Sequence, residues 1–201
     1  MSASYSLNAS QVKTSGIDLH THPLGNSERI RLRYGSYGID VIENSPSLRV
    51  SSLYSTHDLI NISRTIAVVA FQDIDEQAFR MEHLAITNGQ SIGIVFTENG
   101  WVIDKRHQFF GTIAPPCHCF SQSPPTDGFE KLQSAIHVYS LLVEKAGAQF
   151  HYASIAEVHH PDFLQPSDLA AIYGPKFESH RAMTSQTAEF LNIVKSRLLA
   201  L

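Results

Sequence analysis

One run of apolar residues constrains the fold of this 201-residue chain more than any other feature. Residues 66–71 read Ile-Ala-Val-Val-Ala-Phe and directly follow Arg64 and Thr65. An unbroken apolar run of this length is typical of a strand that is buried on both faces. We therefore expect residues 64–71 to form the central strand of a β-sheet.

Further strands are predicted on both sides of that run. They are joined in pairs by turn-forming residues, among them Asn99-Gly100, which two-residue type I′ turns favour. Because strands joined by short turns pair antiparallel, the sequence predicts an α+β domain built on an antiparallel β-sheet of hairpins. The expected strands are 37–43, 48–54, 92–98, 101–107, 137–144 and 150–158, and the expected helices are 73–88, 167–173 and 179–201.

Composition bounds the domain organisation and the partners. With 43% apolar residues the chain can bury one continuous core. We expect a flexible tail at 1–15, an α+β domain at 16–163 and C-terminal helices at 164–201 packed on the same domain. The net charge of -4 argues against nucleic acid as a partner. No apolar run reaches the roughly 18 residues that cross a bilayer, and the N-terminus lacks the features of a signal peptide, so we expect a cytoplasmic protein without a membrane span.

Three ionisable residues interrupt or adjoin apolar strands. They are Arg49, Arg64 and Glu157. A charge on the inner face of a strand is costly unless it meets an opposite charge or a ligand. Two interpretations follow: an arginine pairs with Glu157 or these side chains reach solvent, or they line a ligand pocket. Periodicity alone favours the former.

Histidine and cysteine clusters offer a metal-binding alternative. His20 and His22 form an H-x-H motif of the kind that begins the metal site of many hydrolases. Cys117-His118-Cys119 lacks the second pair that a structural zinc site requires, and His159-His160 is typical of a polar strand end. We therefore expect no metal, and a metal-dependent hydrolase built on His20 and His22 is the least favoured hypothesis.

The order of these segments resembles the chorismate lyase family (chorismate–pyruvate lyase). The likeness runs from about Ser27 to Pro161. It rests on motifs of that family, namely an L-R strand, an R-T strand, a P-L-G before an apolar segment and a terminal glutamate before F-L-P. Their counterparts here are Leu48-Arg49-Val50, Arg64-Thr65-Ile66-Ala67, Ser91-Ile92-Gly93 and Ala156-Glu157-Val158-His159-His160-Pro161.

The resemblance implies a fold, an activity and a set of site residues. The implied fold is an antiparallel sheet with helices packed on one side and an internal cavity, here with a C-terminal helical extension. The implied activity eliminates pyruvate from chorismate to give 4-hydroxybenzoate for ubiquinone biosynthesis, without metal or cofactor. By the same resemblance, Arg49 grips the ring carboxylate, the backbone amide of Ile92 assists it, and Glu157 meets the oxygen at the other end of the ring. Two further residues complete the candidate substrate-binding set: Arg64, and Glu28, which stands where the family has a methionine near the ligand.

Glu157 is expected to act as a proton donor. A carboxyl on an apolar strand should have a raised pKa, so Glu157 should hold a proton and give it to the departing ether oxygen.

The alternative function is a non-catalytic module that senses small aromatic acids, since the ligand domain of GntR-type regulators looks similar in fold. The partner in both cases is a small aromatic carboxylate. The C-terminal helices can serve as a cap, as a homodimer face or as a partner site, and the Pro-rich segment 114–128 should be a long loop.

Overall fold

The computed structural model describes residues 24–72, 77–120, 133–174 and 183–201. In these residues six strands form one antiparallel sheet in the order β1-β2-β3-β6-β5-β4. The strands are β1 (Gly38–Asn44), β2 (Leu48–His57), β3 (Ile60–Phe71), β4 (Val102–Ile113), β5 (Ser134–Lys145) and β6 (Ala148–His159). The helices are α1 (Asn26–Tyr34), α2 (Arg80–Thr87), α3 (Ile92–Glu98), α4 (Pro166–Tyr173) and α5 (Ser185–Ala200), with 3-10 turns η1 (Gln77–Phe79) and η2 (Cys117–Cys119). The α+β class and the antiparallel sheet are confirmed.

The apolar run at 66–71 lies in β3, which is flanked by β2 and β6 in the middle of the sheet. Its side chains Ile66, Val68 and Val69 are at most 3% exposed. The predicted hairpins β1–β2 and β5–β6 form as expected, with register Gly38↔Tyr54 and Lys145↔Ala148 at their respective ends. The central position of β3 is therefore confirmed.

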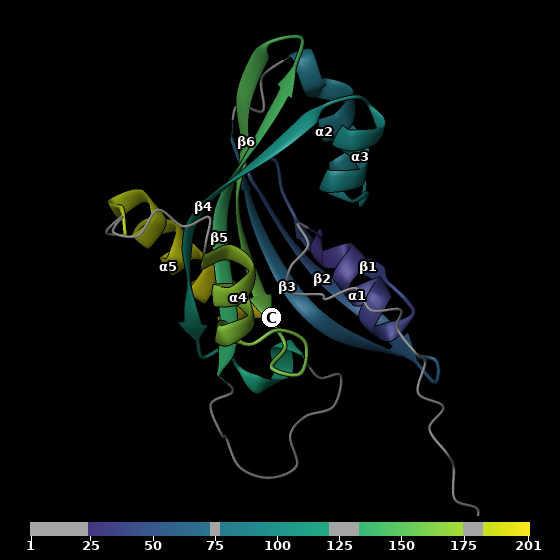
Figure 1. Cartoon of the computed structure of the whole chain (residues 1–201), viewed down its shortest axis with the longest axis vertical. Coiled ribbons are helices and arrows are strands. Elements are labelled where there is room, and N and C mark those ends of the chain that lie inside the picture. Colours follow the sequence, from purple (N-terminus) through teal and green to yellow (C-terminus); the bar gives the residue numbers. More distant parts are fainter. Residues whose placement is uncertain (1–23, 73–76, 121–132, 175–182) are drawn as a thin grey trace, which may run out of the picture.

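The alternation of side chains divides the sheet into two faces with separate cores. Even-numbered residues such as Val50, Val68 and Val158 pack against Leu191 and Val194 of α5. Odd-numbered residues of the same strands face α1 to α4, and Figure 1 shows α1 and α4 over that face. Helices therefore cover both faces of the sheet, not one as expected, because α5 is long and amphipathic enough to cover the even face alone.

The segment before Asn99-Gly100 is a helix, not the predicted strand. Residues 92–98 form α3, and Gly100 has a φ of 75°. The N–H of Trp101 donates to the carbonyl of Phe96, and that of Gly100 donates to Thr97, which is the Schellman end of a helix. The Asn-Gly pair thus closes a helix here, because a positive φ at glycine suits a helix end as well as a type I′ turn.

Helix α1 was not predicted. Only Asn26, Arg29 and Ile30 of its nine residues are buried, so the helix carries too few apolar residues to show a 3.6-residue period. Tertiary contacts hold it: Ile30 is fully buried, and Arg29 donates to the Tyr173 hydroxyl of α4 at 3.2 Å. Its position matters for function because its first residues cover part of the sheet.

Some sequence predictions fall outside the described residues. These are the flexible tail at 1–15, the His20/His22 motif and most of the Pro-rich segment 114–128, of which 114–120 is described. In the part of the chain that the structure describes, none of the helices has the length and apolar character needed to cross a bilayer.

The helix end at Gly100 generates a stability prediction. Gly100→Ala should lower the free energy of unfolding by about 1 kcal/mol, because alanine is strained at a φ of 75°. Gly93→Ala is the matched control within the same helix, since Gly93 has no positive φ and a Cβ there meets nothing within 4 Å. Urea unfolding of both variants measures the difference. Equal stability of the two variants would contradict the assigned helix end.

Candidate functional site

A small pocket lies over the odd-numbered face of the sheet. Its volume is about 130 Å³. Side chains from all six strands line it, and the first residues of α1 and α3 cover it. The polar side chains that line this inner pocket are Asn26, Ser27, Tyr37, Arg49, Ser51, Ser91, Lys105, Tyr139 and Glu157.

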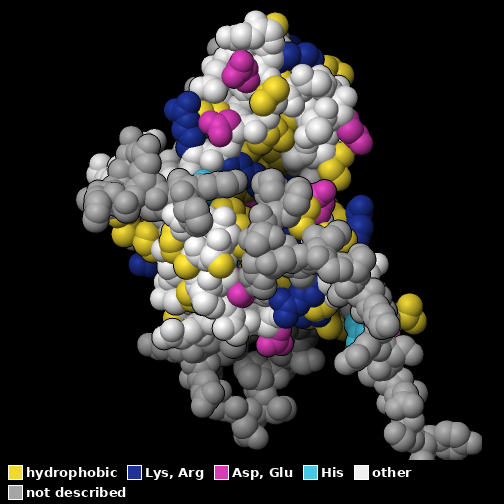
Figure 2. Space-filling model, in the orientation of Figure 1, with side chains coloured by type: hydrophobic (Ala, Val, Ile, Leu, Met, Phe, Trp, Pro, Cys, Tyr) yellow, Lys and Arg dark blue, Asp and Glu magenta, His cyan; other side chains and the backbone are white. Residues whose placement is uncertain are grey.

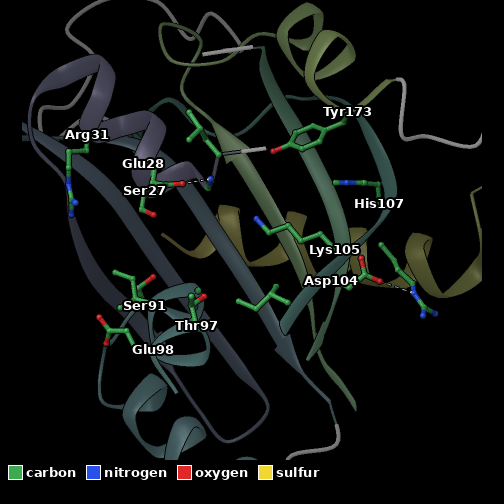
Figure 3. A pocket seen from close by; sticks show the side chains of 16 residues that line it. Ser27, Glu28, Arg31, Ser91, Thr97, Glu98, Asp104, Lys105, His107 and Tyr173 are labelled. Atoms are coloured by element: carbon green, nitrogen blue, oxygen red, sulfur yellow. Dashed lines mark hydrogen bonds and ion pairs between the residues drawn. The ribbon is translucent and has the colours of Figure 1, made fainter. Parts of the chain in front are cut away.

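The inner pocket opens into a larger outer cleft of about 1190 Å³. Figure 3 shows Lys105 of β4 extending into this cleft between residues of α1 and α3. The outer cleft carries side chains of both signs, and Figure 2 shows Lys and Arg interspersed with Asp and Glu on this face. Six residues line both cavities: Gly25, Ser27, Ser91, Gly93, Ile103 and Lys105. A ligand can therefore extend from the inner pocket into the outer cleft.

Arg49 of β2 is a buried cation that no acidic side chain of the described residues neutralises. Its side chain is 1% exposed. The Nε donates to Ser51 Oγ at 2.8 Å, Nη1 donates to the carbonyls of Ile86 and Gln90 at 2.8 and 2.9 Å, and Nη2 donates to Gly89 at 3.4 Å. Burial lowers the pKa of Arg49 from its ordinary value, but a guanidinium stays charged in proteins. Because a buried cation is costly without a counter-charge, this site favours an anionic ligand.

Glu157 of β6 is held by neighbouring polar groups. The Tyr139 hydroxyl donates to Oε1 at 3.2 Å, and His137 Nδ1 lies 3.9 Å from Oε2. Burial raises the pKa of Glu157, but His137 and the positive charge of Lys105 lower it more, so the pKa lies well below its usual range. The expectation of a raised pKa is therefore wrong, because partners on β4 and β5 outweigh burial. Near neutral pH Glu157 is an ionised acceptor.

Arg49 and Glu157 line one pocket without contacting each other. Arg49 pairs with Val69 of β3, Val69 pairs with Ile155 of β6, and Glu157 is two residues beyond Ile155. With strands ~4.8 Å apart and a rise of ~3.3 Å per residue, the two Cα atoms lie ~12 Å apart across β3. Both side chains leave the same face of the sheet, so the pocket lies between a cation and an anion.

Ile92 and Glu28 lie at different depths. Ile92, the first residue of α3, lines the inner pocket. Glu28 is exposed and lines the outer cleft, where its Oε2 accepts the Gly25 backbone N–H at 3.0 Å and so caps α1. The structure thus brings Ile92 together with Arg49 and Glu157, and places Glu28 outside the inner pocket.

Arg64 lines neither of these two cavities. The pairing of β2 with β3 skips Arg64, and this bulge turns its side chain towards α1. The Cζ atom of the Arg64 guanidinium lies 3.8 Å from the centre of the Tyr34 ring, and Nε donates to Ser55 Oγ at 2.9 Å. Arg64 therefore helps to hold α1 on the sheet, and the structure does not bring it together with Arg49 and Glu157 in the inner pocket. Neither arginine forms an ion pair with Glu157.

Apart from Arg49 and Glu157, sequence reasoning missed the polar side chains of the inner pocket, among them Lys105, Tyr139 and Asn26. Lys105 and Tyr139 share the odd-numbered face with Glu157, and the alternation along β4 and β5 could have indicated this. The Lys105 ammonium lies 4.9 Å from the Tyr139 ring centre. No sequence signal marks Asn26, which is 5% exposed and has no hydrogen-bond partner for either amide atom among the described residues. A buried amide without hydrogen bonds is costly, so the Asn26 side chain is suited to bind a polar group of a ligand.

The described residues contain no group of three or more His, Cys, Asp or Glu side chains that could hold a metal ion. His159 is buried, with Nδ1 3.0 Å from Thr65 Oγ1. Cys119 is buried, and its thiol donates to the Leu198 carbonyl at 3.3 Å. His159 thus links β6 to β3 and Cys119 links η2 to α5, while His20 and His22 lie outside the described residues.

Replacement of the Asn26 amide, which has no hydrogen-bond partner among the described residues, should have opposite effects on stability and on ligand binding. Asn26→Leu should raise the free energy of unfolding of the ligand-free protein by about 1 kcal/mol, because it removes buried polar atoms that have no partner. The same change should weaken binding of an aromatic acid. Asn44→Leu is the control, since Asn44 donates to the Thr87 carbonyl at 2.6 Å and its loss should destabilise. Destabilisation by Asn26→Leu in urea unfolding would show that the amide is satisfied without ligand.

Burial of His159 predicts loss of stability in acid. Burial lowers the pKa of His159 to about 4. Below pH ~6.5 His159 is protonated in the unfolded chain but stays neutral in the native state. The free energy of unfolding should therefore fall by at most about 1.4 kcal/mol per pH unit between pH ~6.5 and 4. His159→Asn should flatten this slope in urea unfolding from pH 7 to 5. The exposed His57 is the control, and an unchanged slope in His159→Asn would contradict the assignment.

Comparison of the sequence with protein-family models gives no match, and comparison with curated proteins gives none either. The geometry of the inner pocket and the outer cleft therefore carries the functional argument.

Proposed function

We propose that the inner pocket binds a small ring carboxylate and that the chain is a chorismate-lyase-like enzyme, which eliminates pyruvate from chorismate to give 4-hydroxybenzoate. The observation that carries this proposal is Arg49, a buried cation that no described acid neutralises, in a pocket whose other end holds the ionised Glu157. Both residues stand in segments whose order resembles the chorismate lyase family. A chorismate-lyase-like version of the antiparallel fold belongs to the same proposal.

Arg49 and Ser51 provide the carboxylate-binding end. Four of the five guanidinium N–H groups of Arg49 already donate to protein oxygens, which leaves one on Nη2. The Ser51 oxygen accepts from Arg49, so its own proton is available to a ligand. One carboxylate oxygen can therefore bind Nη2 while the other binds Ser51. The backbone amide of Ile92 is the third donor in this proposal.

The ionised state of Glu157 sets its chemical role. In the elimination, Glu157 takes the proton from the ring carbon that bears the hydroxyl, and the ring becomes aromatic as the ether C–O bond at the neighbouring carbon breaks. The enolpyruvate that leaves takes a proton from the ammonium of Lys105 and becomes pyruvate. Lys105 lines the outer cleft as well as the inner pocket, and regains its proton from solvent there. The elimination is internally balanced and calls for no external oxidant or reductant.

Loss of the guanidinium should abolish tight binding. Arg49→Gln should weaken binding of 4-hydroxybenzoate by roughly 10- to 100-fold, since a hydrogen bond to a charged group is worth about 1.5 to 3 kcal/mol. Arg64→Gln is the matched control, because Arg64 is also a buried arginine but lines neither cavity. Isothermal titration calorimetry measures both affinities, and thermal unfolding confirms that each variant folds.

The reaction itself is tested by incubating the unmodified protein with chorismate and following 4-hydroxybenzoate. Product formation that Glu157→Gln reduces more than it reduces binding supports the assigned base. Saturable binding of an aromatic acid without product would identify a sensing module instead. Unchanged binding in Arg49→Gln would show that the ligand binds elsewhere.

A further inference from the structure

Two histidine rings connect the outer cleft to Glu157. His107 of β4 is half-buried and lines the outer cleft, whereas His137 of β5 is fully buried. His107 Nδ1 lies 2.8 Å from His137 Nε2, and the rings stack with centroids 4.9 Å apart. On the other side of His137, Nδ1 faces Glu157 Oε2 at 3.9 Å, which is longer than a hydrogen bond.

Strand register fixes this arrangement. His137 is the direct cross-strand partner of Glu157 in the β5–β6 pair, so their side chains lie on the same face. The β4–β5 pair has a bulge directly after His107, which pairs with Tyr139. Because Tyr139 and His137 are two residues apart on β5, His107 is the diagonal neighbour of His137 on that face.

Helix α4 covers the histidine pair. The Tyr173 ring stacks on His137 with a centroid distance of 4.0 Å and an interplanar angle of 20°. The centroid of the Tyr173 ring also lies 4.8 Å from that of the His107 ring. The Tyr173 hydroxyl accepts a hydrogen bond from Arg29 of α1. Figure 3 shows His107 and Tyr173 next to each other at one side of the outer cleft. With Tyr173 over its face, His137 is connected to the outer cleft through His107.

We propose that His107 and His137 relay a proton between Glu157 and the outer cleft. This inference rests on the proposed elimination, which leaves a proton on the buried Glu157 after each turnover. In the tautomer that carries the His137 proton on Nε2, protonated Glu157 gives its proton to His137 Nδ1, His137 passes its Nε2 proton to His107 Nδ1, and His107 releases a proton to water in the outer cleft. The transfer leaves the His137 proton on Nδ1, where it faces the ionised Glu157. Each ring ends with the number of protons with which it began, and a small rotation of Glu157 or His137 closes the 3.9 Å gap to hydrogen-bond length.

The surroundings of His137 keep it suited to this role. The charged and titratable groups that face it are Glu157 and His159 of β6, Lys105 and His107 of β4, Tyr139 of β5, Arg29 of α1 and Tyr173 of α4. Burial lowers the pKa of His137, and the nearby Glu157 raises it less. The ring is therefore neutral near pH 7, when one nitrogen accepts a proton while the other donates one.

The relay is tested by His107→Gln, whose amide can hydrogen bond to His137 but cannot pass a proton on. With chorismate, kcat should fall by about 10²-fold while KM stays unchanged, which is the scale of general acid–base catalysis. Free imidazole should restore part of the activity of His107→Ala and none of that of Glu157→Gln. His57→Gln, at the exposed end of β2, should behave as the unmodified protein. Full activity of His107→Gln would overturn the relay.

A second measurement separates the relay from the proposed reaction. Nuclear magnetic resonance of ¹⁵N-histidine-labelled protein reports the exchange of the His137 ring proton with solvent, with no substrate present. The relay predicts rapid exchange for this buried ring in the unmodified protein and loss of rapid exchange in His107→Gln. Equal exchange in both proteins overturns the relay. Failure to convert chorismate together with this difference refutes the elimination and leaves a proton path between Glu157 and solvent.

Discussion

The site depends on one buried guanidinium that has no acidic partner in the described part of the chain. Arg49 is fixed by Ser51 and by three backbone carbonyls, which orient it without neutralising its charge. Folding therefore leaves a positive potential on the pocket floor, and an anionic ligand relieves the penalty of burying it. The negative end at Glu157 is stabilised separately by Tyr139, His137 and Lys105, so the two charges remain apart.

The division of the sheet into two faces makes this separation feasible. Apolar even-numbered side chains meet α5 and supply a continuous core on one side. The odd-numbered face can then carry Arg49, Glu157 and Lys105 over three different strands, because stability does not require that face to be wholly apolar. Helices α1 and α3 cover these charges only with their first residues, so the inner pocket stays connected to the outer cleft.

Alternation and apolar runs predicted the sheet and its centre, since both depend on local pattern. The same reasoning failed at 92–98, where Asn99-Gly100 closes a helix, and at α1, which is held by distant contacts such as Arg29 with Tyr173. Charges within apolar strands indicated Arg49 and Glu157, but not whether they pair. The direction of the Glu157 pKa depends on its neighbours across the sheet, and the role of Arg64 depends on a bulge; neither register nor bulges can be derived from one sequence.

The carbonyls that hold Arg49 belong to Ile86, Gly89 and Gln90, at the end of α2 and in the linker before α3. The guanidinium of Arg49 is thus held in place by the linker between α2 and α3, which lies at the surface. The same linker leads into α3, and the first residue of α3 covers the inner pocket. Insertions, deletions or substitutions in this short linker would shift the guanidinium and the roof together. Ligand preference in such a scaffold can therefore evolve through a peripheral loop, while every side chain that touches the ligand is retained.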